Sequence, residues 1–195
     1  MGVAGLVLAA GAGTRFGASP KQLADFHGRP LLEWAVRAQC EVASLSPVVV
    51  VLGASAPAIL ERVDLGRAET VVCDEWASGQ AWSLRCGVGS LADRGPAVSK
   101  VIVTLGDAPL VTPEVIRLFV SQPPRARALY RGRPGHPVVL GPEEIAALAA
   151  LDGDRGAKEL LRGGPEVEVG HLCSGRDVDT PEDLEEVRDE ARAVI

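Results

Sequence analysis

The sequence has few of the residues that build disulfide frameworks and zinc sites. Among its 195 residues there are four cysteines and three histidines. No two cysteines form a C-x-x-C pair, and no two histidines have H-x-x-x-H spacing. We therefore expect neither a structural zinc site nor a disulfide framework, and we expect the cysteines to be small buried side chains in a reducing compartment. The cysteines are Cys40, Cys73, Cys86 and Cys173, and the histidines are His27, His136 and His171.

The sequence also lacks a long apolar run and an excess of positive charge. Its first apolar run reaches glycine after about eight residues, which is too short to cross a bilayer, and no cationic segment precedes it. The formal net charge is −6, whereas a protein that binds nucleic acid usually carries a basic face. We therefore expect a cytoplasmic protein that binds neither nucleic acid nor a membrane.

The composition is that of a chain with a buried core. Hydrophobic residues make up 47% of the sequence, which suits one domain spanning residues 1–195. The 22 glycines and 14 prolines are scattered between apolar runs, so no linker or repeat is evident.

Strand and helix patterns alternate along the chain. Apolar runs at residues 6–10, 48–52 and 101–105 do not alternate in polarity, which is typical of strands covered on both faces. Helical patterns occupy residues 30–42 and begin again near residues 55 and 112, with Pro30 suited to a first helical position and Thr112 to an N-cap. This order predicts an α/β fold with a doubly wound, mostly parallel sheet, whose ligands lie beyond the carboxyl ends of its strands.

Two later segments add to this pattern. Residues 127–140 suggest two short strands joined by a loop or hairpin, a small insertion that could form a lid over a substrate. A last helix is expected over residues 181–194, with Thr180 as its N-cap and Asp183 completing an acidic variant of the capping box.

A glycine-rich turn that carries cations follows the first expected strand. Its glycines let backbone N–H groups face a ligand, and Arg15 and Lys21 supply the positive charge that a polyphosphate needs. Phe16 breaks both the P-loop pattern and the dinucleotide pattern G-x-G-x-x-G. The second expected strand ends in Gly53 rather than in an acid that would hold a ribose, which argues against a nicotinamide dehydrogenase.

Four sequence blocks resemble one known family. Residues 8–17 with Lys21 are similar to the signature L-A-A-G-x-[SG]-x-R-[MF]-G-x-x-K of nucleotidyltransferases that include the molybdenum cofactor cytidylyltransferases and their guanylyltransferase relatives. Residues 105–111, 135–138 and 177–184 resemble the family's metal loop, its G-[HN]-P segment and its closing D-[IV]-D-T-P-E-D-L block, in family order. The resemblance implies a Rossmann-like nucleotidyltransferase fold over nearly the whole chain.

The resemblance also assigns a nucleotide site. It implies that the glycine turn, Arg15 and Lys21 hold the triphosphate, and that residues 79–85, similar to a G-[MQ]-x-x-S-L-[RK] loop, recognise base and ribose. Arg15, Lys21 and Asp107 are the expected catalytic residues. The nearby tryptophans either stack on a base or a pterin or pack in the core. The expected nucleotide-binding residues are Leu8, Ala9, Ala10, Gly11, Gly13, Thr14, Arg15, Lys21, Gly79, Gln80 and Ser83.

Carboxylates after the third expected strand and near the C-terminus predict a metal site. Asp107 follows a buried strand and precedes Pro109, a strand end at which an oxygen ligand can meet Mg²⁺ and a phosphate. Asp177 and Asp179 are two residues apart, so in an extended segment they point the same way. Asp179 is the preferred second ligand, with local capping of the last helix as the alternative.

Two further residues are candidates for the second substrate. His136 is expected to contact that substrate rather than act as a base, because an attacking phosphate is already anionic near neutral pH. The alternative for His136 is an ordinary loop histidine. Arg155 belongs to a stretch that resembles the family's G-D-[RK]-G-[AV] and could bind the second substrate, or the stretch could be a solvated turn.

The resemblance implies a specific reaction. CMP would pass from CTP to the terminal phosphate of molybdopterin with Mg²⁺ and release of pyrophosphate, and a molybdoenzyme could receive the product. Ala10 favours CTP over GTP, because its Cβ lies near the base pocket of the family. The alternatives are a guanylyltransferase, a cytidylyltransferase for another phosphorylated acceptor, an NAD(P)H-dependent reductase of a heterocyclic pigment, and a carrier without catalysis.

Overall fold

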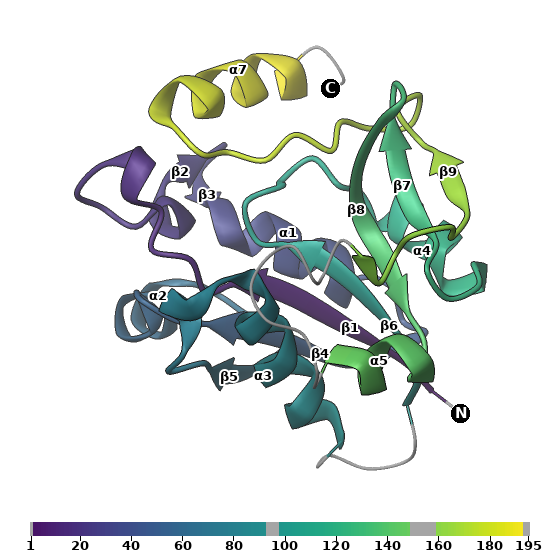
Figure 1. The fold of residues 1–195 in the computed structure, drawn as a ribbon. Coiled ribbons are helices and arrows are strands. Elements are labelled where there is room, and N and C mark those ends of the chain that lie inside the picture. The colour runs from purple at the N-terminus through teal and green to yellow at the C-terminus, as the bar shows by residue number, and fades with distance from the viewer. Residues whose placement is uncertain (1, 93–97, 149–158, 193–195) are drawn as a thin grey trace.

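A seven-stranded sheet organises the computed structural model, which describes residues 2–92, 98–148 and 159–192. The strand order is β5-β4-β1-β6-β8-β7-β9 (Figure 1). The strands of this sheet are β1 (Gly2–Ala9), β4 (Leu45–Leu52), β5 (Glu69–Val72), β6 (Val98–Leu105), β7 (Arg127–Tyr130), β8 (Arg133–Leu140) and β9 (Glu166–Glu168).

The sheet is mostly parallel, as the sequence predicts. Strand β1 pairs in parallel with β4 on one side and β6 on the other, and β4 pairs in parallel with β5. Strand β8 runs antiparallel to both β6 and β7, and β7 pairs in parallel with β9. The hairpin expected over residues 127–140 is therefore β7 and β8, which extend the sheet beyond β6.

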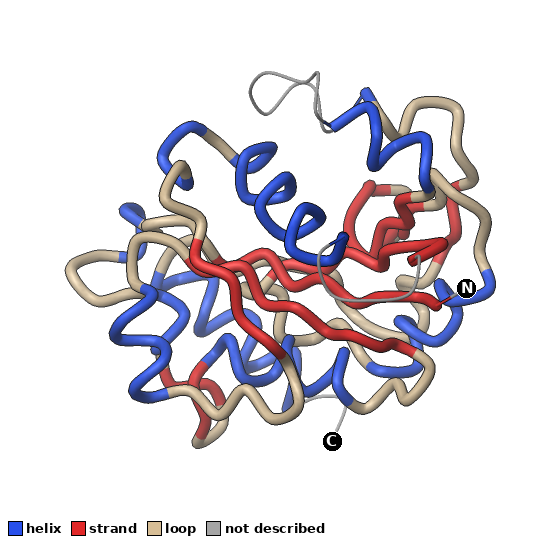
Figure 2. The backbone as a smooth tube through the Cα atoms, turned by 90° about the horizontal axis from the view of Figure 1, so that it is seen from below, coloured by secondary structure: helices blue, strands red, loops and turns tan. Residues whose placement is uncertain are grey.

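Helices cover both faces of the sheet (Figure 2). Residues of α3 and α5 belong to the core cluster on one face, and residues of α1, α2 and α4 to the clusters on the other. This arrangement confirms the predicted doubly wound class. The α-helices are α1 (Leu31–Cys40), α2 (Ala56–Arg62), α3 (Gln80–Ala92), α4 (Pro113–Ser121), α5 (Pro142–Leu148) and α7 (Pro181–Arg192). Short elements are β2 (Asp25–Phe26), β3 (Arg29–Pro30), η1 (Thr14–Phe16), η2 (Lys21–Leu23) and η3 (Trp76–Ser78).

Local sequence signals set the starts of α4 and α7. The Thr112 hydroxyl accepts a hydrogen bond from the Val115 N–H at 3.4 Å and caps α4. In α7 the Thr180 N–H donates to Asp183 Oδ2 at 2.8 Å, and the Asp183 N–H donates back to Thr180 Oγ1 at 3.2 Å, which is the expected acidic capping box. Pro30 is the N-cap of α1 rather than its first helical residue, because it still pairs with β2.

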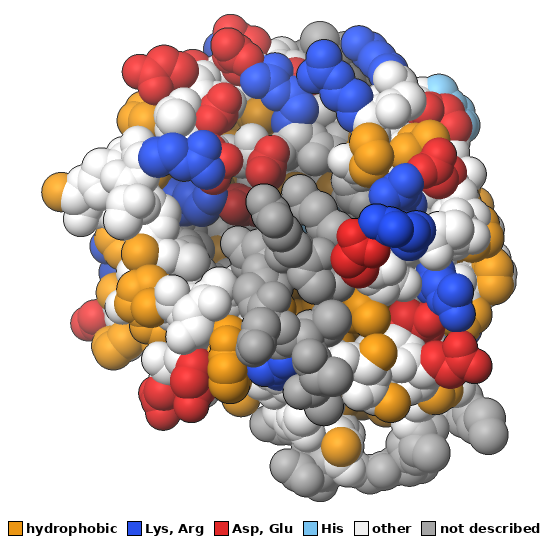
Figure 3. All heavy atoms as spheres, in the orientation of Figure 1, with side chains coloured by type: hydrophobic (Ala, Val, Ile, Leu, Met, Phe, Trp, Pro, Cys, Tyr) orange, Lys and Arg blue, Asp and Glu red, His pale blue; other side chains and the backbone are white. Residues whose placement is uncertain are grey.

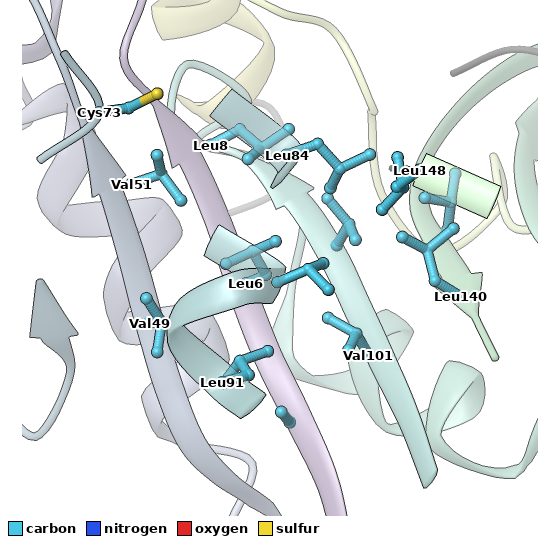
Figure 4. Packing of buried hydrophobic residues seen from close by; sticks show 14 of the residues in the cluster. Leu6, Leu8, Val49, Val51, Cys73, Leu84, Leu91, Val101, Leu140 and Leu148 are labelled. Carbon is cyan, nitrogen blue, oxygen red and sulfur yellow. The ribbon is translucent and has the colours of Figure 1, made fainter. Parts of the chain in front are cut away.

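The core between β1 and α3 is close-packed (Figure 4). Leu6 and Leu8 of β1 point toward α3, where Leu84 and Leu91 pack on the sheet. Helix α3 approaches so closely that a Cβ on Gly87 would lie 2.5 Å from Leu6 Cδ1. A larger residue there would overpack the core at a cost of about 1–3 kcal/mol.

Helix α7 fixes the segment that precedes it. Val178 is fully buried with Leu184 and Val187 of α7 in a cluster that also holds Phe26 and Leu31. The Val178 N–H donates to the backbone oxygen of Asp107 at 2.9 Å. Asp177 and Asp179, on either side of Val178, are thereby held beside the end of β6, although β6 is distant from them in the sequence.

No helix within residues 2–92, 98–148 and 159–192 is both long and apolar enough to span a membrane.

The cysteines depart in part from the expectation. Cys73, just after β5, and Cys86, within α3, form a disulfide with their Cα atoms 5.8 Å apart, so the expectation of no disulfide is wrong for this pair. The chain folds back between β5 and α3 and brings together two residues that lack any pairing motif. Cys40 and Cys173 are free, as expected.

We expect the Cys73–Cys86 disulfide to stabilise the folded protein. Replacing both residues by serine should lower the free energy of unfolding by about 2–4 kcal/mol, because the unfolded chain is no longer cross-linked. Denaturant titrations with and without a reductant measure this loss. The control is Cys40→Ser with Cys173→Ser, which should still lose stability on reduction; an unchanged wild type on reduction would contradict the prediction.

Candidate active site

The ends of β1 and β6 form the crevice in which ligands of doubly wound sheets bind. The chain continues from β1 to one side of the sheet and returns as β6 on the other side, which makes this pair the topological switch point. The Gly106 N–H donates to the Leu8 carbonyl at 2.8 Å and ties the two strand ends together. A Cβ on Gly106 would lie 2.8 Å from Ala9 Cβ, so only glycine allows this approach.

The glycine turn after β1 is held open by a buried side chain. Gln22 is 3% exposed, and its Nε2 donates to the carbonyls of Ala9 at 3.1 Å and Gly11 at 2.9 Å. Gly13 has φ 61° and leads into η1, a left-handed conformation that favours glycine. Sequence reasoning missed Gln22, whose only signal is its place next to Lys21.

A cavity of about 450 Å³ lies over this turn and the end of β6. Every residue expected to bind nucleotide lines it, from the turn after β1 and from the loop that enters α3. Asp107, Asp177 and Asp179 line the same cavity, and so does Trp76. The structure therefore brings together residues from four separate parts of the sequence. The lining residues expected to bind nucleotide are Leu8, Ala9, Ala10, Gly11, Gly13, Thr14, Arg15, Lys21, Gly79, Gln80 and Ser83.

Lys21 joins the two carboxylates expected to hold a metal ion. Its Nζ lies 2.6 Å from Asp107 Oδ2 and 2.9 Å from Asp179 Oδ1. Arg15 approaches Asp179 from the other side, with Nη2 2.8 Å from Oδ2. The Lys21 side chain is only 9% exposed, whereas that of Arg15 is 71% exposed. The inner cation is thus enclosed and the outer one meets solvent.

The charges of this cluster stabilise one another. Burial opposes the charge of Lys21, but Asp107 and Asp179 outweigh burial and raise the pKa of the ammonium. Burial raises the pKa of Asp107 above its usual range, and Lys21 counteracts that effect. Lys21 therefore stays charged at neutral pH and supports the ionised form of its partner.

One oxygen of this cluster has no partner among the described residues. Asp107 Oδ1 is buried and accepts no hydrogen bond, although an unsatisfied buried carboxylate oxygen is costly. A hard divalent cation prefers carboxylate ligands of this kind. Asp107 with Asp179 therefore fits the donor set of Mg²⁺ or Mn²⁺.

A second, larger cavity of about 1720 Å³ adjoins the first. The two share Arg15, Asp177 and Asp179, so the carboxylates stand at the boundary between them. Arg131 and Arg133 of the β7–β8 hairpin line the larger cavity. Charged side chains of both signs gather on the upper half of the face in Figure 3, beside and below α7.

Two expected or considered residues, His136 and Trp82, lie outside the 450 Å³ cavity. His136 lies in β8 and lines neither cavity, although its neighbour Gly135 does. Its backbone oxygen accepts a hydrogen bond from the Tyr130 hydroxyl at 2.5 Å. Arg155 falls outside the described residues. Trp82 packs under the Arg85 guanidinium, 4.7 Å from its ring centre, so of the two tryptophans near α3 only Trp76 reaches the 450 Å³ cavity.

Comparisons with known proteins agree with this geometry. Residues 5–169 match the family model described as MobA-like NTP transferase domain. A nicotine blue oxidoreductase of Paenarthrobacter nicotinovorans is 35% identical over 197 aligned positions, covering 93% of this chain and 94% of that protein.

Solved structures show the same fold. A homologue of Mycobacterium tuberculosis Rv0371c from Mycobacterium sp. strain JC1 superposes with a TM-score of 0.83 at 28% identity, covering 99% of this chain and 98% of that one. Rv0371c of Mycobacterium tuberculosis in complex with manganese has a TM-score of 0.79 at 27% identity, covering 97% and 99%.

The environment of His136 makes a prediction about pH. Burial lowers the pKa of its imidazole to about 4, so the unfolded chain binds a proton more readily than the folded one between about pH 6.5 and pH 4. Stability should therefore fall as pH drops through this window, by on the order of 3 kcal/mol from this group.

Denaturant titrations at several pH values test this dependence. His136→Gln should flatten the loss relative to wild type, whereas His171→Gln, which changes an exposed ring, should leave it intact. Identical pH profiles for wild type and His136→Gln would show that the ring is not held neutral by burial.

Proposed function

The chain belongs to the MobA-like NTP transferase family of nucleotidyltransferases, and we propose that it transfers CMP from CTP to the terminal phosphate of molybdopterin with release of pyrophosphate. One observation carries the proposal. The phosphate-type glycine turn and the carboxylate after β6 meet at a single point, where Lys21 Nζ lies 2.6 Å from Asp107. A triphosphate on that turn would end at that carboxylate.

Binding of the nucleotide falls to the turn and its cations. Gly11 and Gly13 line the 450 Å³ cavity, and since they lack side chains their backbone N–H groups can approach a phosphate closely. Arg15 and Lys21 neutralise the phosphates, and Lys21 stabilises the charge that develops at the α-phosphate. Trp76 at the cavity wall offers a flat surface for the base.

Asp107 and Asp179 are the proposed ligands of Mg²⁺. A bound Mg²⁺ would neutralise phosphate charge and polarise the α-phosphate. The orphaned Asp107 Oδ1 supports this assignment, because a cation would give it a partner. The cap of α7 is made by Thr180 and Asp183, so Asp179 is not needed for capping through its side chain.

The larger cavity is the proposed entrance of the acceptor. Its boundary with the nucleotide cavity lies at Arg15, Asp177 and Asp179. An acceptor phosphate oxygen would attack the α-phosphorus there, forming a new P–O bond as the bond to pyrophosphate breaks. The acceptor phosphate is already anionic, so this step needs positioning rather than a base. His136 lines neither cavity, and its pKa of about 4 makes it a weak base, so it is not assigned the role of a base.

A pigment reductase is the second candidate. The observation that favours it is the 35% identical relative of nearly equal length, which is named a nicotine blue oxidoreductase. The end of β4 argues against a dehydrogenase-type nicotinamide site, because Gly53 stands where an acid would hold the ribose and packs against Trp76. A Cβ at Gly53 would lie 2.7 Å from Trp76 Cβ.

The proposal includes the protein's setting. We place the reaction in the cytoplasm within one domain, with a molybdoenzyme as recipient of the dinucleotide product. A carrier without catalysis would tolerate loss of Asp107, whereas an enzyme would not.

Asp107 and Lys21 make the first prediction about activity. Asp107→Asn should lower Mg²⁺-dependent pyrophosphate release from CTP and molybdopterin by roughly 10³-fold, and Lys21→Ala by roughly 10²-fold, because each removes charge stabilisation at the reacting phosphate. Pyrophosphate release with CTP or GTP, with and without Mg²⁺, is the measurement.

Glu61→Gln is the matched control, since Glu61 is an exposed acid on α2, and its turnover should equal that of wild type. Full activity of either site variant would contradict the assigned roles. Oxidation of NAD(P)H by a heterocyclic pigment that survives Asp107→Asn would support the reductase instead.

Ala10 makes a prediction about base choice. It is 4% exposed and lines the nucleotide cavity, so Ala10→Gly removes a methyl group from the proposed base pocket. The ratio of kcat/KM for CTP over GTP should fall by about tenfold or more, which corresponds to ~1–3 kcal/mol of discrimination.

Ala12→Gly is the control for Ala10→Gly, because it loosens the same turn and removes a methyl group from the same cavity, at a position that is not proposed to face the base. This variant should lower kcat/KM for CTP and for GTP by the same factor. An unchanged CTP to GTP ratio in Ala10→Gly would mean that another residue selects the base.

A further inference from the structure

Lys21 occupies the position between two carboxylates that a divalent ion would need. We propose that Lys21 is a resident counter-cation: its ammonium and the divalent ion exclude each other at Asp107 and Asp179, and a nucleotide admits the ion by drawing Lys21 onto its phosphates. This inference rests on the proposed nucleotide site and adds an order of binding to it. In this scheme the free protein binds the ion weakly, and the nucleotide and the ion strengthen each other.

The contacts of Lys21 are those of a bridging cation. Its Nζ lies 2.6 Å from Asp107 Oδ2 and 2.9 Å from Asp179 Oδ1, so it takes one oxygen from each carboxylate. Arg15 takes the second oxygen of Asp179 at 2.8 Å. Only Asp107 Oδ1 is left without a hydrogen bond. An incoming ion would therefore find one free ligand atom on this pair and three that already face cations.

The position of the Lys21 ammonium, rather than the net charge, opposes a divalent ion. Lys21 and Arg15 offset two of the three negative charges of Asp107, Asp177 and Asp179, all of which line this cavity, so one negative charge is left. A divalent ion on Asp107 and Asp179 would lie within a few ångströms of the Lys21 ammonium, which is 2.6 Å and 2.9 Å from these carboxylates, and like charges that close repel strongly. The ion can bind well only after the ammonium moves away.

The three carboxylates of this cavity do not converge as three ligands of one metal ion. Within residues 2–92, 98–148 and 159–192, the one group of three His, Cys, Asp or Glu ligand atoms that lie within 4.8 Å of one another is Cys73, Glu75 and Cys86, two of which are joined by the disulfide. Asp107, Asp177 and Asp179 do not form such a group. This spacing agrees with Lys21 standing between them.

The stem of Lys21 allows the exchange. It runs beneath the glycine turn, where a Cβ built on Gly13 would lie 3.1 Å from Lys21 Cγ. The ammonium is the tip of a flexible side chain that passes under the glycine turn, and in this structure the tip contacts the carboxylates. Rotation about side-chain bonds can move it from the carboxylates to a phosphate while the backbone of η2 stays in place.

Thermodynamic linkage gives the consequence. If the nucleotide raises the affinity for the ion by some factor, the ion raises the affinity for the nucleotide by the same factor. Direct contact between ion and phosphates also contributes to this factor. Removing the ammonium isolates the contribution of Lys21. Without nucleotide, the ion should then bind more tightly, and the factor by which the nucleotide increases the affinity for the ion should be smaller.

Manganese binding to the full chain tests the proposal. Electron paramagnetic resonance of free Mn²⁺ gives its affinity in the wild type and in Lys21→Met, with and without CTP and in the absence of any acceptor. Lys21→Met without CTP should bind Mn²⁺ at least about tenfold more tightly than wild type, because an ammonium no longer competes. The factor by which CTP increases the affinity for Mn²⁺ should be smaller in this variant than in the wild type.

Three further variants locate the effect. Lys100→Met removes the same charge from a lysine whose Nζ contacts the carbonyls of Val120 and Gln122, and it should leave Mn²⁺ affinity unchanged. Adding Asp107→Asn to Lys21→Met should abolish the gain. Lys21→Gln keeps the packing of the stem and replaces Lys21→Met if circular dichroism shows that the methionine variant is unfolded.

The outcomes separate this inference from the proposed function. A gain in Mn²⁺ affinity below about tenfold in the Lys21 variant, or an equal gain in Lys100→Met, overturns the inference even if the enzyme turns over CTP. If the Lys21 variant shows the full gain in Mn²⁺ affinity but the wild type transfers CMP to no phosphorylated acceptor, the proposed reaction is overturned and the cation exchange still holds.

Discussion

The ion pairs of Lys21 with Asp107 and Asp179 are the constraint on which the rest of the site depends. They join the turn after β1, the loop after β6 and the segment before α7, none of which is close to the others in sequence. Each carboxylate is placed by packing rather than by its neighbours in the chain. Gly106 lets Asp107 sit against the end of β1, and buried Val178 carries Asp179 to it.

Much of this arrangement is predictable because it is encoded locally. Unbroken apolar runs give β1, β4 and β6, and the caps at Thr112 and Thr180 mark α4 and α7. Parallel strands place their carboxyl ends at one edge, so the meeting of the glycine turn with Asp107 follows from topology. The resemblance of residues 177–184 to a family block supplied Asp179, which composition and periodicity alone left open between a ligand and a cap.

The features that escaped prediction depend on tertiary contacts. Gln22 supports the glycine turn only because η2 folds beneath it, and a glutamine carries no pattern that announces this role. Cys73 and Cys86 meet because the chain reverses between β5 and α3, which no spacing rule captures. His136 belongs to a family-like block, yet the pairing of β8 with β6 and β7 directs it away from both cavities.

The two cavities explain how one phosphate-binding frame can support different chemistries. A glycine turn with two cations will hold any nucleotide phosphate, so it is compatible with transfer and with reduction alike. What favours transfer in this chain lies next to the turn. The smaller cavity meets the larger one at Asp177 and Asp179, so in the proposed complex the reactive phosphorus, rather than a base or a ribose, would face the second ligand. To deliver a hydride there, a nicotinamide cofactor would have to place its nicotinamide ring at that boundary. Its phosphates would then lie away from the positive charges of Arg15 and Lys21.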